Sequence, residues 1–245
     1  MTPHFWTLTF FSIAFEILYV GSLAYAYQKS DISLVYPLAR ALPLLLTALV
    51  SALFGLGSRQ PGPLALLGMG IIFLGCLCMP LQHFRDFRLK AYFNPILFLI
   101  VLAAIGTTGY TVLDSCVMEE MVQVYQKKSL ILSMSYLFII EAGISLGALL
   151  LVCLNKTERK EWIRLVKTHS FAPILTGICS SSAYVLILLS MNHVSNVCYI
   201  QAFRQLSLPL GVLAGILILK ESHAIPKILG TIIIVLGLLM VALFP

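Results

Sequence analysis

The chain has 245 residues, of which 60% are hydrophobic and only 11% are charged. A soluble globular domain carries about a quarter charged residues, so this composition excludes a soluble protein and predicts an integral membrane protein. The net charge of +6 lies mostly in loops between apolar stretches, which favours a role in membrane orientation over nucleic-acid binding.

Continuous apolar stretches predict eight transmembrane helices and no strands, because the apolar residues do not alternate with polar ones. Most have roughly the 20 residues that a helix needs to cross the hydrocarbon layer. The segment MTPHFW before the first stretch lacks a basic signal-peptide region, so we expect a retained helix there. In chain order the predicted spans are Phe5–Tyr27, Ile32–Leu56, Leu64–Leu81, Pro95–Met118, Ser129–Leu154, Ser170–Met191, Ser195–Leu219 and Lys227–Phe244.

Lysines and arginines are distributed unequally between alternate loops. The positive-inside rule predicts that the richer side is cytoplasmic, in a multi-pass protein of the plasma (inner) membrane. With eight spans, both termini would then face outward. The richer side holds Lys29, Arg85, Arg88, Lys90, Lys156, Arg159, Lys160, Arg164, Lys167, Lys220 and Lys227, and the other holds Arg59, Lys127 and Lys128.

Two stretches, Asp31–Leu81 and Ser195–Pro245, share an internal pattern. In each, a helix with one arginine in its first half precedes a short turn and a second helix with a Gly-x6-Gly spacing. Internal repeats of this kind are common in membrane transporters. The aligned positions are Arg40 with Arg204, Gly68 with Gly230, and Gly75 with Gly237.

The segments YPLARALPLL and QAFRQLSLPLGVLAGILILKE, each followed by a glycine-containing helix, resemble the EamA family of the drug/metabolite transporter (DMT) superfamily. The resemblance implies ten helices in two inverted five-helix repeats around a central substrate cavity. Residues 1–82 would supply three helices of a partial first repeat, and residues 83–245 a complete second repeat. Two helices of the family pattern are therefore missing. The family also places both termini in the cytoplasm, which conflicts with the loop charges.

Five charged residues fall inside the predicted spans, where a charge is costly and indicates a functional site. Glu16 and Glu141 lie near mid-span and would bind a proton or a cationic substrate, or else act as structural acids paired with arginine. Arg40 and Arg204 would clamp an anion, or hold the repeats together through ion pairs. Asp114 lies near the end of its span and could simply reach the membrane interface.

Several uncharged polar residues also fall within spans or at their starts, among them Tyr19, Tyr36, Tyr110, Tyr184, Tyr199 and Gln201. Tyr110 and Tyr199 join the five charged residues as candidates for the substrate or ion pathway. The alternative for any of these tyrosines is an interface belt or core packing.

Small residues in the spans predict packing positions. Gly143-x3-Gly147 and Gly211-x3-Gly215 allow close helix approach, with a homodimer face as the alternative. The six cysteines lie in or beside apolar stretches and have no histidine at metal-ligand spacing, so we expect neither a metal site nor a disulfide framework.

No nucleophile elbow, P-loop or H-E-x-x-H motif occurs, so we expect no enzyme, no ATP hydrolysis and no cofactor. The sequence favours a secondary transporter, expected to be an exporter, of a small organic solute or metabolite by alternating access. Its partners would be the solute and the lipid bilayer. The alternative is a non-transporting or partner-dependent membrane protein, a truncated remnant or accessory subunit, because two helices are missing.

Overall fold

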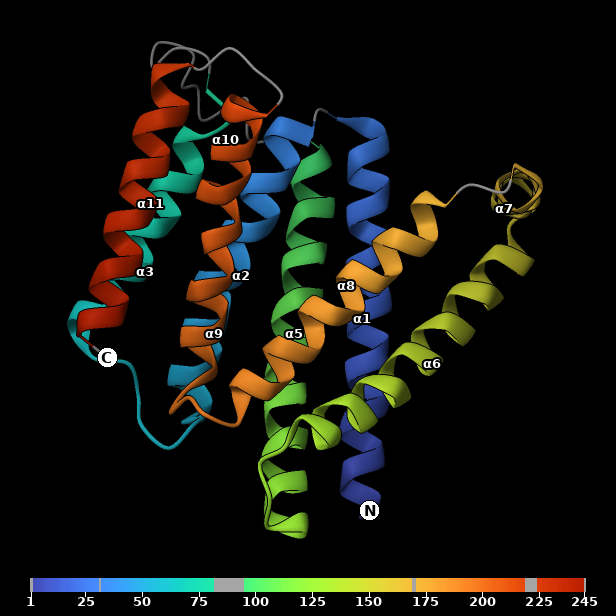
Figure 1. Cartoon of the computed structure of the whole chain (residues 1–245), viewed down its shortest axis with the longest axis horizontal. Helices are drawn as coiled ribbons and strands as arrows, with labels where there is room; N and C mark the ends of the chain where they lie inside the picture. The colour runs from blue at the N-terminus through green and yellow to red at the C-terminus, as the bar shows by residue number, and fades with distance from the viewer. Residues whose placement is uncertain (1, 31, 82–94, 169–170, 219–223, 245) are drawn as a thin grey trace. The chain divides into compact units, whose positions relative to one another are not determined.

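The computed structural model describes residues 2–30, 32–81, 95–168, 171–218 and 224–244. Every regular element within these residues is a helix, which confirms the all-α prediction (Figure 1). The elements are α1 (Pro3–Lys29), α2 (Ile32–Phe54), α3 (Pro63–Cys78), α5 (Pro95–Tyr125), α6 (Leu130–Leu154), α7 (Lys156–Lys167), α8 (Ala172–Met191), α9 (Val197–Phe203), the 3-10 turn η2 (Arg204–Leu206), α10 (Ser207–Leu217) and α11 (Ile225–Leu243).

Seven helices in the described part of the chain are long and apolar enough to cross a membrane, when α9 to α10 count as one. The chain is therefore a multi-pass membrane protein. The third predicted span differs, because α3 has only 16 residues and reaches about 24 Å. Pro80 accounts for its early end, since proline has no N–H to donate to the carbonyl four residues earlier and its ring clashes there.

Two helices, α5 and α7, differ from the prediction. α5 continues past its expected end at Met118 to Tyr125, through a segment that contains no glycine or proline. α7 replaces the long basic loop that was expected between the fifth and sixth spans. Asn155 starts α7 by accepting a hydrogen bond at Oδ1 from the Thr157 N–H, at 3.0 Å.

The seventh predicted span is broken at its arginine. The α-helix α9 ends at Phe203, and the 3-10 turn η2 carries Arg204 before α10 resumes at Ser207. Pro209 explains the break, because it cannot donate to the carbonyl of Gln205. Arg204 therefore lies where the regular hydrogen-bond pattern of a membrane helix is interrupted.

The chain divides into two compact units, each discontinuous in sequence. The first unit comprises Met1–Ile17 and Tyr110–His193, and the second comprises Leu18–Gly109 and Val194–Pro245. The helices α1 and α5 each contribute one part to each unit.

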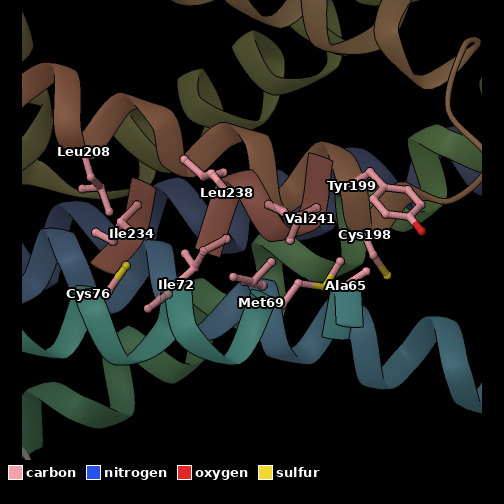
Figure 2. Close-up of a cluster of buried hydrophobic side chains, with 13 residues drawn as sticks. Ala65, Met69, Ile72, Cys76, Cys198, Tyr199, Leu208, Ile234, Leu238 and Val241 are labelled. Atoms are coloured by element: carbon pink, nitrogen blue, oxygen red, sulfur yellow. The ribbon is translucent and has the colours of Figure 1, made fainter. Parts of the chain in front are cut away.

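The core of the second unit forms where α3 packs along α11 (Figure 2). Met69 and Ile72 of α3 meet Ile234, Leu238 and Val241 of α11, and all five side chains are buried. In a bilayer, lipid tails are as apolar as these side chains, so close van der Waals packing supplies the stabilisation.

Glycines let the backbones of α3 and α11 approach closely. A Cβ atom on Gly68 would lie 2.9 Å from the carbonyl oxygen of Gly237, and one on Gly230 would lie 2.7 Å from that of Gly75. The first glycine of each helix therefore faces the second glycine of the other. This crosswise pairing means that α3 and α11 run antiparallel.

Two further glycines serve the same purpose in the first unit. A Cβ atom on Gly143 or Gly147 of α6 would overlap the side chain of Ile13 or Ile17 of α1. The Gly-x3-Gly face of α6 is thus filled from within the chain. Gly211 of α10 is different, because a Cβ atom there would meet nothing within 4 Å.

Asn196 fastens the connection between α2 and α3 to the start of α9. Its amide group donates to Ser51 Oγ at 2.8 Å and to the carbonyl of Leu56 at 2.7 Å. Its Oδ1 accepts from the N–H of Cys198 at 3.0 Å, which caps α9. The side chain is only 2% exposed, so water cannot replace these partners.

We expect Asn196→Ala to lower the free energy of unfolding by about 1–3 kcal/mol, because buried donors and acceptors lose their partner. Thermal unfolding in detergent measures the change as a midpoint several degrees lower. Asn155→Ala is the matched control, since Asn155 also caps a helix but is exposed. Equal effects of the two substitutions would contradict the special role of Asn196.

Candidate functional site

The first unit contains a buried carboxylate held by three hydroxyl groups, which we name the hydroxyl cage. Asp114 of α5 is fully buried. Its Oδ1 accepts from Ser12 Oγ of α1 at 2.5 Å and from the Tyr136 hydroxyl of α6 at 2.7 Å. Its Oδ2 accepts from the Tyr184 hydroxyl of α8. Four helices thus converge on one acid.

Asp114 does not lie near the end of its helix, where the predicted span placed it. Helix α5 continues about three turns past Asp114, so the carboxylate lies well inside the helix. The expected end at Met118 was too early, because the segment after it lacks a helix-breaking residue and continues the helix.

Aromatic side chains surround the hydroxyl cage. The ring of Tyr110, one turn before Asp114 on α5, lies 5.9 Å from the Tyr184 ring in an edge-to-face arrangement and is 2% exposed. On the other side, the buried Phe5 ring lies 6.1 Å from the Tyr136 ring. These rings exclude water, which strengthens each polar contact that Asp114 makes.

The other two candidate acids of the first unit, Glu16 and Glu141, lie in partly buried positions. Glu141 of α6 accepts at Oε1 from the Ser181 hydroxyl of α8 at 2.8 Å. Glu16 follows Ser12 by one turn of α1, and its Oε2 atom is buried. All three acids that the sequence analysis singled out, Glu16, Asp114 and Glu141, therefore lie in the first unit.

The sequence prediction missed Ser12 and Tyr136, which complete the hydroxyl cage. A signal was present in the helical spacing. Ser12 and Glu16 lie four residues apart, as do Tyr110 and Asp114, so each pair shares one helix face. A polar stripe on an otherwise apolar membrane helix indicates a face turned toward other polar groups.

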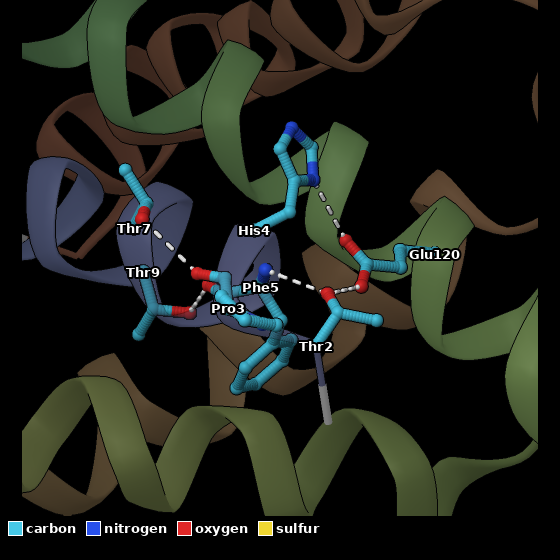
Figure 3. Close-up of polar contacts among 7 residues, drawn as sticks. All are labelled: Thr2, Pro3, His4, Phe5, Thr7, Thr9 and Glu120. Carbon is cyan, nitrogen blue, oxygen red and sulfur yellow. Dashed lines mark hydrogen bonds and ion pairs between the residues drawn. The ribbon is translucent and has the colours of Figure 1, made fainter.

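A second group of polar side chains joins the start of α1 to α5 (Figure 3). The hydroxyl of Thr2 donates to Glu120 Oε1, and His4 Nδ1 lies 3.0 Å from Glu120 Oε2. The imidazole of His4 is 71% exposed, so this contact is solvated and contributes little stability.

The second unit contains a small pocket that both aligned arginines line, named here the arginine pocket. The Arg40 guanidinium lies 5.4 Å from the centre of the Tyr36 ring, and Arg204 donates to Gln201 Oε1 at 3.3 Å. The pocket is partly open and holds about 10 Å³, room for one water-sized group. The lining residues are Tyr19, Ala39, Arg40, Pro43, Thr107, Gln201, Arg204 and Gln205.

Gln205 connects the two arginine-bearing helices. Its amide group donates to the carbonyl of Arg40 and to that of Gln201, each at 3.1 Å, and it is 1% exposed. The buried Gln205 amide thus links the segments that carry Arg40 and Arg204, and all three residues line the arginine pocket. Tyr199, the remaining candidate, packs instead in the hydrophobic core between α3, α9 and α11 (Figure 2).

The candidates therefore form two groups. Glu16, Tyr110, Asp114 and Glu141 lie in the first unit, and Arg40, Tyr199 and Arg204 lie in the second. Among the residues with described positions, His, Cys, Asp and Glu side chains form no group of three that could hold a metal ion.

Comparison with protein-family models and with curated proteins found no match to this chain.

Proposed function

We propose that this chain is a secondary transporter of a small organic solute, working by alternating access in the plasma (inner) membrane. The observation that carries the proposal is the hydroxyl cage. A carboxylate buried inside a membrane-spanning helix is costly to insert, and such acids mark substrate and ion pathways. Asp114 is that acid, with no exposed surface and donors from three other helices.

The cage offers a simple basis for coupling. Three hydroxyl donors from α1, α6 and α8 stabilise the negatively charged carboxylate of Asp114 by hydrogen bonds. If a rearrangement withdraws one of these helices, the carboxylate must take another partner, either a proton or a cationic group of the solute. The partner then biases the equilibrium between the two states by its differential affinity for them.

Membership of the EamA family and an inverted repeat are part of the same proposal. The crosswise contacts of Gly68 with Gly237 and of Gly75 with Gly230 support a two-fold relation between α3 and α11. Arg40 of α2 and Arg204 of η2 line one pocket, which supports the same two-fold relation for the helices that precede α3 and α11. We propose export as the direction of transport. The sequence contains no ATP-binding motif that would favour an ATP-driven pump.

The direct test is transport by the purified protein in proteoliposomes loaded with a pH-sensitive dye. A panel of amino acids, organic acids, organic cations and sugars is added under an imposed proton gradient. We expect at least one solute to move protons faster than in empty vesicles. A protein that moves neither protons nor radiolabelled solutes across the whole panel would contradict the transporter proposal.

The arginine pocket yields a second prediction. We expect Arg40→Gln and Arg204→Gln each to lower the transport rate by about tenfold or more, because a charge-assisted hydrogen bond is worth roughly 1.5–3 kcal/mol. Arg59→Gln is the matched control, since Arg59 lies exposed between α2 and α3. Uptake of labelled solute at equal amounts of inserted protein gives the comparison. Equal rates in all three variants would refute a role for the pocket.

The alternative function is an accessory subunit that needs a partner. One observation favours it: α6 and α8 each bury only 11% of their most apolar window, whereas α5 buries 50%. Lipid or a partner chain must cover the remaining surface. Cross-linking in native membranes separates the two functions, because an accessory subunit would be recovered with a second protein and would be inactive alone.

A further inference from the structure

Within the described residues, α7 buries none of its side chains, although it forms part of the first unit and follows α6 directly. All twelve of its residues are exposed, including Trp162 at 50% and Val166 at 55%. An isolated helix of this length is only marginally stable in water. Something other than packing against the described residues must therefore stabilise it.

Most side chains of α7 separate into an apolar and a basic side, with Glu158 and Arg159 interspersed among the apolar residues. Trp162, Ile163, Leu165 and Val166 make its apolar face. The basic face carries Lys156, Lys160, Arg164 and Lys167, which recur at the three- and four-residue spacing of one helix side, and Ile163 lies at its border with the apolar face. A short helix with this pattern, rich in Lys and Arg and containing Trp, is typical of helices that lie in a membrane interface.

The connections of α7 place it at the membrane surface. It begins two residues after α6 ends at Leu154, and α8 begins at Ala172, five residues after its own end. Both neighbours are long and apolar enough to span the membrane. The extended backbone of Asn155 turns the chain, and Figure 1 views α7 end-on while α6 runs across the picture.

We propose that α7 is an interfacial helix that binds the surface of an anionic membrane. The apolar face lies at the boundary between headgroups and acyl chains, where tryptophan is favoured. The basic face contacts anionic lipid headgroups, which attract lysine and arginine near the surface. Only Glu158 and Glu161 oppose its five cations, and Glu161 already pairs with Arg164 at 3.1 Å.

The sequence offers a clean probe, because Trp6 and Trp162 are the only two tryptophans. The full-length Trp6→Phe protein is reconstituted into vesicles of phosphatidylcholine and phosphatidylglycerol. We expect lipids brominated near the top of the acyl chain to quench Trp162 several-fold more strongly than lipids brominated near its end. We also expect weak quenching by aqueous acrylamide. Strong acrylamide quenching without quenching by either brominated lipid would overturn the interfacial placement.

The anionic preference is tested separately with two matched double variants. Lys160→Gln/Lys167→Gln removes two charges from the basic face, and Lys127→Gln/Lys128→Gln removes two exposed charges between α5 and α6. We expect the first pair to lower the phosphatidylglycerol retained per protein during purification by about half or more, and the second to leave it unchanged. Equal retention in both variants would overturn the binding of anionic headgroups. Neither experiment depends on transport, so the proposed function can fail while this inference stands.

Discussion

Asp114→Asn should abolish solute-coupled transport while leaving the protein inserted and folded. The amide has almost the shape of the carboxylate, but it has no charge and offers one acceptor oxygen where the cage supplies three donors. A hydrogen bond to a charged group is worth roughly 1.5–3 kcal/mol, so the rate should fall on the order of 100-fold or more. Proteoliposome uptake at matched protein content measures the loss.

Two further measurements separate a functional acid from a structural one. Glu119→Gln makes the same chemical change at an exposed site on the same helix and should transport normally. Tyr184→Phe and Tyr136→Phe remove one donor each and should give intermediate rates. If Asp114→Asn transports at the normal rate from pH 5 to 8, the cage only stabilises the fold and the coupling proposal is wrong.

Glu141→Gln tests the acid that the sequence placed at mid-span. It accepts a hydrogen bond from the Ser181 hydroxyl, and its side chain is only partly buried. If Glu141 exchanges protons during transport, the substitution should remove the pH dependence of the rate while insertion stays normal. A pH profile equal to that of the natural protein would make Glu141 a structural acid.

Gly75→Leu should prevent the second unit from folding normally. Any side chain at this position meets the carbonyl oxygen of Gly230 at 2.8 Å and the side chain of Ile234 at 2.7 Å. A backbone carbonyl cannot move aside, so α3 and α11 would have to separate. Overpacking usually costs about 1–3 kcal/mol, and a clash with backbone should exceed that range.

Gly70→Leu is the control for this prediction. It lies on the same helix, and a Cβ atom there meets nothing within 4 Å. The fraction of monodisperse protein after detergent extraction, together with the thermal midpoint, should fall sharply for Gly75→Leu and hardly for Gly70→Leu. Similar losses for both would mean that α3 and α11 are not in tight backbone contact.

The sequence by itself determined the class of the protein and most of its helices. Long apolar stretches must satisfy their backbone hydrogen bonds internally within a membrane, so length and composition are enough to predict spanning helices. Helix ends were less certain. Pro80 shortened α3, and the uninterrupted segment after Met118 lengthened α5, because local breakers rather than hydropathy decide where a helix stops.

The sequence also singled out Asp114 and the two arginines as charges within spans, but it could not assign their partners. Hydropathy shows that a charge within a span is costly, but it does not identify the side chains that form hydrogen bonds or ion pairs with it. Ser12 and Tyr184 are far from Asp114 in the chain and approach it only because α1 and α8 pack beside α5 in the first unit.

The basic segment Lys156–Lys167 is a second case in which the sequence did not predict the structure. Its charges predicted a loop on the cytoplasmic side, and only the structure revealed a helix with separated apolar and basic faces. A membrane-spanning helix is specified by the apolar content of its own residues. The hydroxyl cage, the arginine pocket and the faces of α7 depend instead on side-chain directions, which are settled only when the helices form and pack.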